Sequence, residues 1–348
     1  MKAARLITAV VCMVFSSPAI AANREPSLAE LFETVDPGVV EIATIQEMIA
    51  DEGPTKRTRA GGLGSGFLIS EDGLIMTASH VVQLAEDVAV RWVTGEVSKA
   101  KIVSTNPNAD VAIIRAEKVP ESIKPLVLAD SDQVRIGDEV FIIGAPRTYA
   151  HSLTVGHVSA RRVPKDLFGG IEPVELLQTD AAINEGNSGG PMFNMNGEVI
   201  GVVSHILSQS GGSEGLGFVV TSNLARTEML EKRPFWSGID GFQLTEGWAK
   251  IFNLPQGAGI LVEQVAAGSA SARIGLQPGS FRAEIEGQNL TVGGDIILAI
   301  QGIPVGAENF GSKVEQATTE LAEEDFLELK VLRSGRIISL SKPIGELR

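Results

Sequence analysis

The chain has 348 residues, of which 44% are hydrophobic and 5% aromatic, and it contains 38 glycines. Its length allows two or three compact domains, and its composition excludes a disordered or fibrous chain. The net charge of −14 disfavours a polyanionic partner, so we expect no nucleic-acid binding.

Residues 1–22 have the pattern of a secretory signal peptide. Lys2 and Arg5 make the N-terminal end positive, an apolar run follows from Leu6 to Phe15, and Ala19-Ile20-Ala21 provides a small-residue cleavage site. The apolar run is too short to span a membrane comfortably, although an uncleaved anchor is the alternative. We therefore expect an exported protein, in the periplasm or outside the cell.

Cys12 is the only cysteine, and it lies inside this leader. It follows Val11 rather than the small residue that precedes a lipid-attachment cysteine, which weakens a lipoprotein interpretation. Without a thiol, the mature chain has no disulfide, cysteine nucleophile or thiolate metal site.

Between Val39 and Val220 the chain consists of short β-branched runs separated by Gly, Asp and Asn turns. The expected strands include Gly66–Ile69, Leu74–Thr77, Val88–Trp92, Val111–Arg115, Val140–Ile143, Leu153–Ala160 and Val199–Ile206. Asp72-Gly73 and Asn196-Gly197 suit tight hairpins between such runs. Closed barrels leave no strand edge exposed, so residues 23–230 predict two antiparallel β-barrels in a mainly β protein.

The sequence pattern changes after this region. A helix from Asn223 to Leu230, capped by Ser222 or Asn223, and a linker at 231–234 are expected to end the barrels. Residues 231–348 then predict the linker and a small α+β domain. Its expected elements are strands at Gly257–Val265 and Ile296–Ile300, helices at Ser269–Ile274 and Ser312–Leu321, a hairpin of Phe326–Leu332 and Arg336–Leu340, and an extra hairpin around Gly287 within Ser280–Val292.

Two side chains at strand ends fit the needs of serine hydrolysis. His80 ends an apolar strand, where its imidazole is placed to accept a hydroxyl proton. Asp110 directly precedes the apolar run from Val111 to Ile114, where a carboxylate can orient that imidazole. Taken alone, a histidine such as His80 is more often structural, and an aspartate before a strand, such as Asp110, is usually a turn former.

The third feature is the glycine-rich segment Gly186–Pro191, which contains Ser188. A nucleophilic serine needs an exposed hydroxyl on a tight turn and backbone N–H groups that face the developing oxyanion. Gly186, Asn187 and Ser188 are the predicted oxyanion hole, with the N–H groups of Gly186 and Ser188 as donors. Alone the segment is compatible with a hairpin loop, but His80, Asp110 and Ser188 in this order predict an acyl-enzyme mechanism without a cofactor.

Together these segments resemble the HtrA/Deg family of trypsin-like serine endopeptidases with a single PDZ domain, over the chain from about Pro26 onward. The motifs that carry the resemblance are Gly64–Phe67, Thr77–Val82, Asp110–Ala112, Thr179–Asn184, Gly186–Pro191 and Gly215–Phe218. The resemblance implies unfolded or misfolded envelope proteins as substrates and a homotrimer packed through Leu28–Val35. A loop at Ile45–Gly62 looks too short for the larger cages of some relatives.

The resemblance also implies a substrate pocket. Ala182 occupies the position that holds an acidic residue in trypsin, and an alanine cannot pair with a cation. Ile183 and Ile206 are the expected walls, which favours cleavage after small or medium aliphatic residues. Ordinary core packing is the alternative for both isoleucines. The segments 164–173 and 208–214 match the family's activation loops.

For the C-terminal domain the resemblance implies a site for peptide C-termini. The residues expected there are Gly257, Ala258, Gly259, Ile260 and Val262. Consecutive N–H groups of the glycine-rich turn would hold the carboxylate, Leu261–Val265 would be the edge strand that the peptide extends, and Ser312–Leu321 would form the other wall. A simple turn is the alternative for Gly257–Ile260.

Other patterns are weaker. The glycines between Gly61 and Gly66 lack the spacing of a phosphate-binding loop, and His151, His157 and His205 are too scattered to predict a metal site. The main alternative function is a noncatalytic chaperone or peptide-sensing adaptor with the same fold. Hydrolysis of a small ester is a third possibility, and it would leave the peptide-binding domain unexplained.

Overall fold

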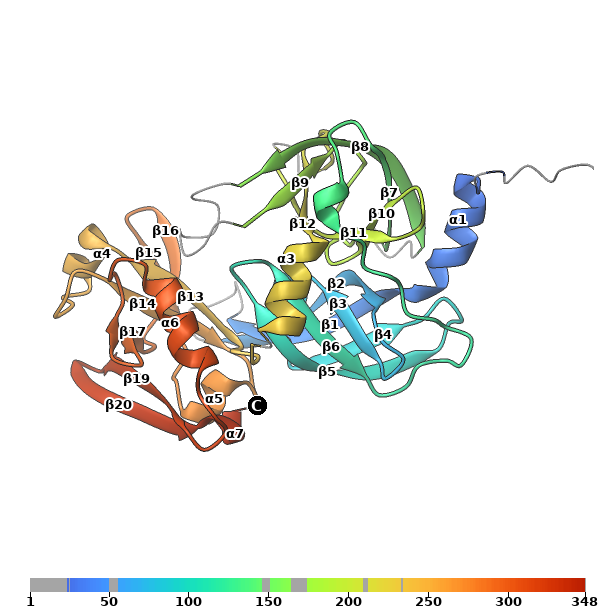
Figure 1. Cartoon of the computed structure of the whole chain (residues 1–348). Helices are drawn as coiled ribbons and strands as arrows, with labels where there is room; N and C mark the ends of the chain where they lie inside the picture. The colour runs from blue at the N-terminus through green and yellow to red at the C-terminus, as the bar shows by residue number, and fades with distance from the viewer. Residues whose placement is uncertain are drawn as a thin grey trace, which may run out of the picture.

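The computed structural model describes residues 24, 26–49, 56–145, 151–163, 174–208, 212–232 and 234–347. It contains two closed β-barrels followed by a C-terminal α+β domain (Figure 1). The prediction of a mainly β fold with two antiparallel barrels is confirmed. Within the described ranges, no helix is long and apolar enough to cross a membrane. The expected signal peptide lies outside them.

The first barrel closes in the order β1-β2-β3-β6-β5-β4. Its strands are β1 (Val39–Ile49), β2 (Arg57–Leu68), β3 (Leu74–Thr77), β4 (Asp87–Arg91), β5 (Val97–Asn106) and β6 (Val111–Ala116). Alternate residues of these strands, such as Ile42 and Ile75, fill the barrel together with Trp92. The segment 45–62 was expected as a loop, and this is wrong: β1 and β2 pair from Val39 with Phe67 out to Ile49 with Arg57.

The second barrel closes in the order β10-β11-β12-β9-β8-β7. Its strands are β7 (Glu139–Gly144), β8 (Ser152–Arg162), β9 (Leu176–Thr179), β10 (Pro191–Asn194), β11 (Val199–Ile206) and β12 (Gly217–Thr221), and the 3-10 turn η2 (Ser131–Gln133) precedes β7. The pairing of β11 with β12 shifts register between Val203 and His205, so Ser204 is the extra residue of a β-bulge.

One apolar cluster joins the two barrels. Phe67 and Met76 of the first barrel belong to the same buried cluster as Phe141 and Phe193 of the second. The rings of Phe141 and Phe193 are stacked, with centroids 4.8 Å apart. This shared core fixes the barrels against each other, and with them the strand ends that carry the predicted site.

The N-terminal helix α1 (Leu28–Val35) lies on the side of the barrels away from the C-terminal domain (Figure 1). It begins with a capping box in which Ser27 and Glu30 satisfy each other's backbone N–H groups. Leu31 and Val35 are buried against the shared core, and the 3-10 turn η1 (Asp36–Gly38) leads into β1. The expected helix after the second barrel is α3 (Ser222–Arg226), which the π-helical turn η4 (Thr227–Glu231) continues. The expected cap at Ser222 or Asn223 is wrong, because the N-cap residue is Thr221, whose side chain makes no capping hydrogen bond.

The C-terminal domain is built on a sheet with the path β13-β14-β17-β19-β20, which β18 joins at β17. Its strands are β13 (Ile239–Leu244), β14 (Gly259–Val265), β15 (Phe281–Ile285), β16 (Gln288–Val292), β17 (Ile296–Ile300), β18 (Ile303–Pro304), β19 (Phe326–Arg333) and β20 (Arg336–Pro343). Its helices are α4 (Glu246–Ile251), α5 (Ala270–Ile274), α6 (Phe310–Thr319) and α7 (Ile344–Leu347). The extra hairpin around Gly287 is confirmed as β15 and β16, which form a separate two-stranded sheet.

The expectation that Leu261–Val265 forms a free sheet edge is wrong. β14 pairs with β13 along its length and with β17 at Ile260 and Leu261, so it lies inside the sheet. Val262 is fully buried, and its N–H donates to the carbonyl of Asp295 at 2.8 Å. The free edge on this side belongs to β13, which the sequence pattern had not indicated.

Candidate active site

Ser188 lies on the turn between β9 and β10. Two glycines of this turn, Gly186 with φ 99° and Gly189 with φ 83°, adopt the left-handed conformation that side chains resist. Ser65 of β2 ties the turn to the first barrel, because its N–H donates to the carbonyl of Ser188 at 2.8 Å and its hydroxyl to that of Gly186 at 2.7 Å. The nucleophile predicted from sequence therefore lies at the junction of the barrels.

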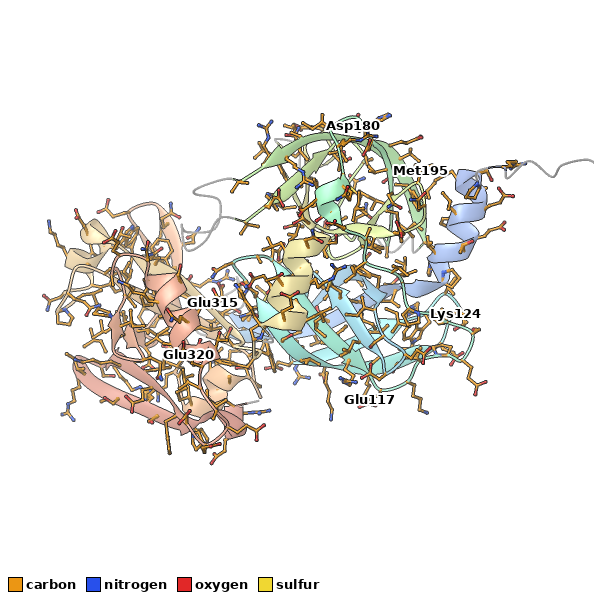
Figure 2. All side chains as sticks on the ribbon, in the orientation of Figure 1. Glu117, Lys124, Asp180, Met195, Glu315 and Glu320 are labelled. Atoms are coloured by element: carbon orange, nitrogen blue, oxygen red, sulfur yellow. The ribbon has the colours of Figure 1, made fainter. Side chains whose placement is uncertain are left out.

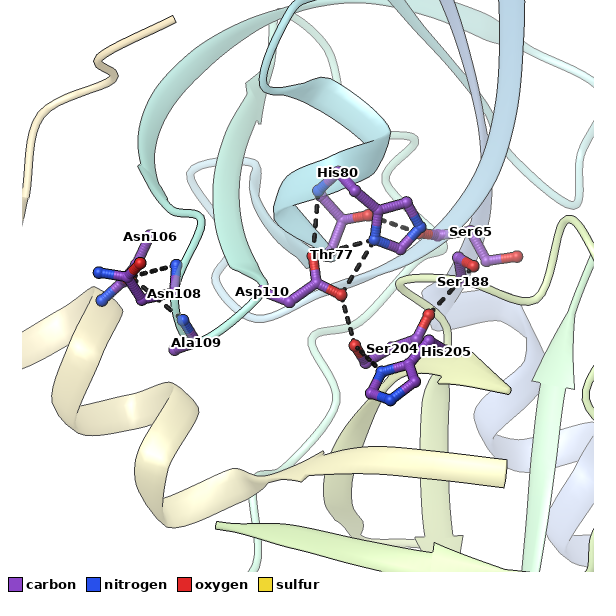
Figure 3. Close-up of polar contacts among 10 residues, drawn as sticks. All are labelled: Ser65, Thr77, His80, Asn106, Asn108, Ala109, Asp110, Ser188, Ser204 and His205. Carbon is purple, nitrogen blue, oxygen red and sulfur yellow. Dashed lines mark hydrogen bonds and ion pairs between the residues drawn. The ribbon is translucent and has the colours of Figure 1, made fainter. Parts of the chain in front are cut away.

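His80 lies on the helical turn α2 (Ser79–Val82), which begins directly after β3. Its Nδ1 is 2.9 Å from Oδ1 and 3.0 Å from Oδ2 of Asp110, and its backbone N–H donates to the same Oδ1 at 3.0 Å (Figure 3). The side chain of His80 is 50% exposed and that of Asp110 is 8% exposed. Burial lowers the pKa of His80, but the hydrogen bond and charge of Asp110 outweigh burial and raise that pKa above its ordinary 6.5.

Asp110 is presented by a turn that the side chain of Asn106 holds together. The amide oxygen of Asn106 accepts the N–H groups of Asn108 at 3.0 Å and of Ala109 at 3.2 Å. Its amide nitrogen donates to Glu228 at 2.8 Å, which fixes the amide's orientation. Asp110 itself has φ 53°, a left-handed conformation that aspartate tolerates better than most residues.

The bulge in β11 places Ser204 against both ends of the site. Its carbonyl accepts the hydroxyl of Ser188 at 3.3 Å, and its own hydroxyl donates to Oδ2 of Asp110 (Figure 3). Next to it, Nδ1 of His205 is 3.0 Å from the hydroxyl oxygen of Ser204. Sequence reasoning missed the contribution of Ser65, Asn106, Ser204 and His205. No local pattern marks the bulge that brings the last two to Asp110.

The predicted oxyanion hole has two backbone donors available. The N–H of Asn187 donates to the carbonyl of Asn184 at 3.0 Å. The N–H groups of Gly186 and Ser188 donate to no protein acceptor within the described part of the chain. Donors of this kind can bind the oxyanion of a tetrahedral intermediate. The side chain of Asn187 is buried, and its Oδ1 accepts no hydrogen bond from the residues that the structure describes.

The predicted pocket residues differ in exposure. Ala182 is half-buried. Ile183 is 2% exposed within the core of the second barrel, and Ile206 packs against the same cluster. A Cβ added to Gly217 would lie 2.6 Å from Cδ1 of Ile183, so the strand β12 closely adjoins this side chain. The predicted activation segment 164–173 lies outside the described residues, as do residues 209–211 of the second.

A cavity of about 380 Å³ adjoins His80, Asp110 and His205. Ile239 and Asp240 of β13 also line this cavity, so the C-terminal domain borders the candidate active site. Gln83, one turn after His80, donates from Nε2 to the hydroxyl of Ser237 at 2.9 Å and to the carbonyl of Ile239 at 3.0 Å. The part of the chain that is described contains no group of three or more side chains able to hold a metal ion.

Two six-stranded barrels with a His–Asp pair and a glycine-flanked serine at their junction define the chymotrypsin-like class of serine proteases. A family model for the trypsin-like peptidase domain matches residues 64–202. The chain is 34% identical over 300 residues to a probable periplasmic serine endoprotease DegP-like of Pseudomonas putida W619, covering 84% of this chain and 57% of the relative. A DegP-like endoprotease of Hahella chejuensis is 30% identical over 355 residues, covering 92% and 70%.

Solved structures agree with these relatives. The HtrA-type protease AlgW with a decapeptide is 26% identical, with a TM-score of 0.53, and the match covers 91% of this chain and 98% of that one. AlgW with a tripeptide is 27% identical, with a TM-score of 0.53 and coverage of 91% and 96%. The chain belongs to the HtrA/DegP-like family of serine endoproteases. It spans 57% to 58% of the length of the first curated relatives that it matches.

Proposed function

We propose that this chain is a periplasmic serine endopeptidase that cleaves unfolded or misfolded proteins through an acyl-enzyme. The observation that carries the proposal is the close pairing of His80 with a buried Asp110 beside the turn of Ser188. Ser188 is the nucleophile, His80 the general base and then general acid, and Asp110 the group that orients His80 and stabilises its protonated form.

The resting hydrogen bond of Ser188 suggests the first step of the reaction. Its hydroxyl donates to the carbonyl of Ser204, so it must rotate toward Nε2 of His80 before it can lose its proton. Attack on the scissile carbonyl then creates an oxyanion, which the N–H groups of Gly186 and Ser188 receive. His80 then gives the proton to the leaving amine. In the second half of the reaction, His80 takes a proton from a water molecule that attacks the acyl group, and it returns a proton to the oxygen of Ser188 as the acyl group leaves.

The specificity that we propose is cleavage after small or medium aliphatic residues. Ala182 offers no carboxylate for a lysine or arginine, and Ile183 and Ile206 are apolar. Ile206 is only partly buried against the core of the second barrel, which supports it as a rigid wall of a shallow pocket, whereas Ile183 is 2% exposed and belongs to that core. An unfolded polypeptide can place such a side chain there because its backbone is free to extend.

The C-terminal domain is proposed to be a PDZ domain that binds peptide C-termini at β13 rather than at β14. β13 has a free edge, and a cavity of about 300 Å³ lies next to it, between the linker that precedes β13, the helix α6 and the turn between β5 and β6 of the first barrel. Phe235, Phe310 and Val314 give the cavity an apolar lining that suits a hydrophobic terminal side chain. Peptide binding beside the linker to the protease domain would allow regulation of activity.

Assembly is also a proposal. The helix α1 lies away from the C-terminal domain, so a homotrimer formed through it would leave both the active site and β13 accessible. Phe32 of α1 is only partly buried in the single chain. Analytical ultracentrifugation of the purified chain, with Phe32→Glu as the variant expected to give monomers, tests this arrangement.

Proteolysis of reduced casein tests the catalytic proposal. The wild-type chain is expected to release fragments that end in small or medium aliphatic residues, as read by mass spectrometry. Ser188→Ala should release none, and the exposed Ser159→Ala should act like wild type. If neither the wild type nor Ser188→Ala cleaves, even with hydrophobic C-terminal peptides added, but both prevent aggregation of the casein, the chaperone or adaptor function is favoured.

Calorimetric titration tests the PDZ proposal. A peptide with a hydrophobic C-terminal residue should bind with a free carboxylate and bind much more weakly when amidated. Val314→Glu, which places a charge in the apolar cavity, should abolish binding, whereas Lys313→Glu on the exposed side of α6 should not. Equal binding of both peptides, or insensitivity to Val314→Glu, would exclude this site.

A further inference from the structure

A second imidazole lies within hydrogen-bond distance of the network that holds Asp110. His205 follows the bulged residue Ser204, and its Nδ1 is 3.0 Å from the hydroxyl oxygen of Ser204. In a regular strand, consecutive side chains point to opposite faces, so these two would not meet. The bulge removes that alternation and lets Ser204 and His205 both reach the site.

Counting protons settles which atom donates. The hydroxyl of Ser204 has one proton, and it is directed at Oδ2 of Asp110, because a carboxylate only accepts. The contact between Ser204 and His205 therefore requires the proton to lie on Nδ1 of His205. The resulting chain runs from His205 to Ser204 to Asp110, which also accepts from His80.

The orientation of the His205 ring is fixed by Phe218 on the neighbouring strand. The two rings are stacked, with centroids 5.0 Å apart and planes inclined by 19°. Burial lowers the pKa of His205, and the charge of His80 adds to this, whereas Asp110 acts in the opposite direction. The neutral ring with its proton on Nδ1 is therefore favoured. Among the described residues, the charged or titratable groups that line the same cavity are Asp110 before β6, His80 on α2 and Asp240 on β13.

We propose that His205 is a positioning residue: it donates a hydrogen bond to Ser204 and thereby directs the Ser204 hydroxyl onto Asp110. Donation into the oxygen of Ser204 polarises its O–H group and strengthens its bond to Asp110, since hydrogen bonds in a chain reinforce one another. Asp110 is then held in the orientation that His80 needs, with part of its negative charge drawn toward Ser204. This role rests on the proposed protease function.

Three variants distinguish the effect of the hydrogen-bond donor of His205 from the effect of its ring packing. His205→Phe keeps a ring to stack on Phe218 and removes the donor. His205→Asn loses the ring but can place an amide N–H near the position of Nδ1. Ser204→Ala removes the group through which His205 is proposed to act. Kinetics are measured with a casein-derived fluorogenic peptide, on variants whose Tm and circular dichroism show that they are folded.

The expected loss in His205→Phe is about tenfold in kcat, with KM within about twofold, because one hydrogen bond in the network is lost. His205→Asn should keep kcat within about threefold of wild type. The acid limb of kcat/KM should move to higher pH in His205→Phe, since Asp110 then retains more charge and holds the proton of His80 more strongly. In the Ser204→Ala background, His205→Phe should have no further effect.

A larger loss in His205→Asn than in His205→Phe would overturn the proposal in favour of a ring-packing role. An additive effect of His205→Phe in the Ser204→Ala background would show that His205 does not act through Ser204. Wild-type activity and an unmoved acid limb in His205→Phe would show that His205 does not position Asp110. These outcomes are distinct from failure of the proposed function, because that failure would leave the wild-type chain itself without activity.

Discussion

The basicity of His80 depends on its pairing with Asp110. This pairing raises the pKa of His80 above 6.5 against the opposing effect of burial. Because His80 accepts a proton only when neutral, kcat/KM should fall as the pH decreases through this raised pKa, with the midpoint above 6.5. A pH profile of peptide hydrolysis measures it. An acid limb centred below 6.5 would contradict the pairing seen here.

The same pairing contributes to folding stability with a definite sign. A raised folded-state pKa means that the His80–Asp110 pair stabilises the fold fully below pH 6.5, and that this contribution is lost as the pH rises through the folded-state value. Activity and this contribution to stability therefore change in opposite directions with pH.

Asp110→Asn should lower kcat by about 10³ to 10⁴ while the chain stays folded. The carboxylate of Asp110 accepts hydrogen bonds from Nδ1 and the backbone N–H of His80 and from the hydroxyl of Ser204. In the variant, the NH2 group of the amide would face one or more of these N–H and O–H groups and could not accept their hydrogen bonds. His80 would then be held in the wrong tautomer. The measurement is kcat for peptide hydrolysis, with the exposed Asp132→Asn as control. A loss below about tenfold would remove Asp110 from the mechanism.

At the scale of elements, the turn between β5 and β6 controls where Asp110 lies. Its conformation depends on the amide oxygen of Asn106, which accepts two backbone N–H groups, and on Glu228, which fixes that amide. Asn106→Ala should lower kcat about tenfold and cost about 1–2 kcal/mol of stability, because two backbone donors lose their acceptor. Asn108→Ala, in the same turn, should leave kcat near the wild-type value. Similar kinetics for both variants would contradict this role of Asn106.

The strands and turns also show how much of the secondary structure the sequence patterns predicted. β3, β11 and β17 have the boundaries that their β-branched runs predict, and the Asp72-Gly73 and Gly287 turns join strands as expected. β13 was missed, because Asp240 and Gly241 interrupt its apolar pattern and it follows a linker that contains Pro234. Its omission led to the wrong edge strand, since β14 is the more apolar of the two and a buried central strand is the most apolar kind.

The candidate site was predicted more completely than the groups around it. His80, Asp110 and Ser188 each lie in a segment whose chemistry is local: a strand end, a turn before a strand and a glycine-rich loop. Ser65, Ser204 and His205 act through contacts between strands that lie far apart in the chain, such as the 94 residues that separate Ser204 from Asp110. Only the closure of the barrels brings these groups together.

At the scale of the whole molecule, the shared core predicts that the two barrels unfold together. Phe193 of the second barrel packs with Phe67 and Met76 of the first, so Phe193→Ala should cost about 3–5 kcal/mol. The fluorescence of Trp92, buried in the first barrel, should report the full shift in the denaturation midpoint. Trp236→Phe and Trp248→Phe remove the other tryptophans. An unchanged Trp92 transition would show that the barrels unfold independently.

The contact between the protease and the C-terminal domain also includes a charged link. Lys232, at the end of the barrel region, donates to Glu228 at 2.8 Å and pairs with Glu315 on α6. Figure 2 labels Glu315 on this helix. These two carboxylates raise the pKa of Lys232 despite its partial burial. Glu228 also accepts from Asn106, so the side chains of Glu315, Lys232, Glu228 and Asn106 connect α6 to the turn that presents Asp110.

The measurement that tests the central claim most directly is labelling with a fluorophosphonate, under conditions in which the chain digests casein. We expect one phosphonyl group per chain, located on Ser188 by peptide mass spectrometry, with activity lost in proportion to labelling. His80→Ala should be labelled far more slowly, because its serine lacks a base. Inactivation with the label on another residue, or casein digestion that continues when Ser188 is fully labelled, would contradict the proposed mechanism.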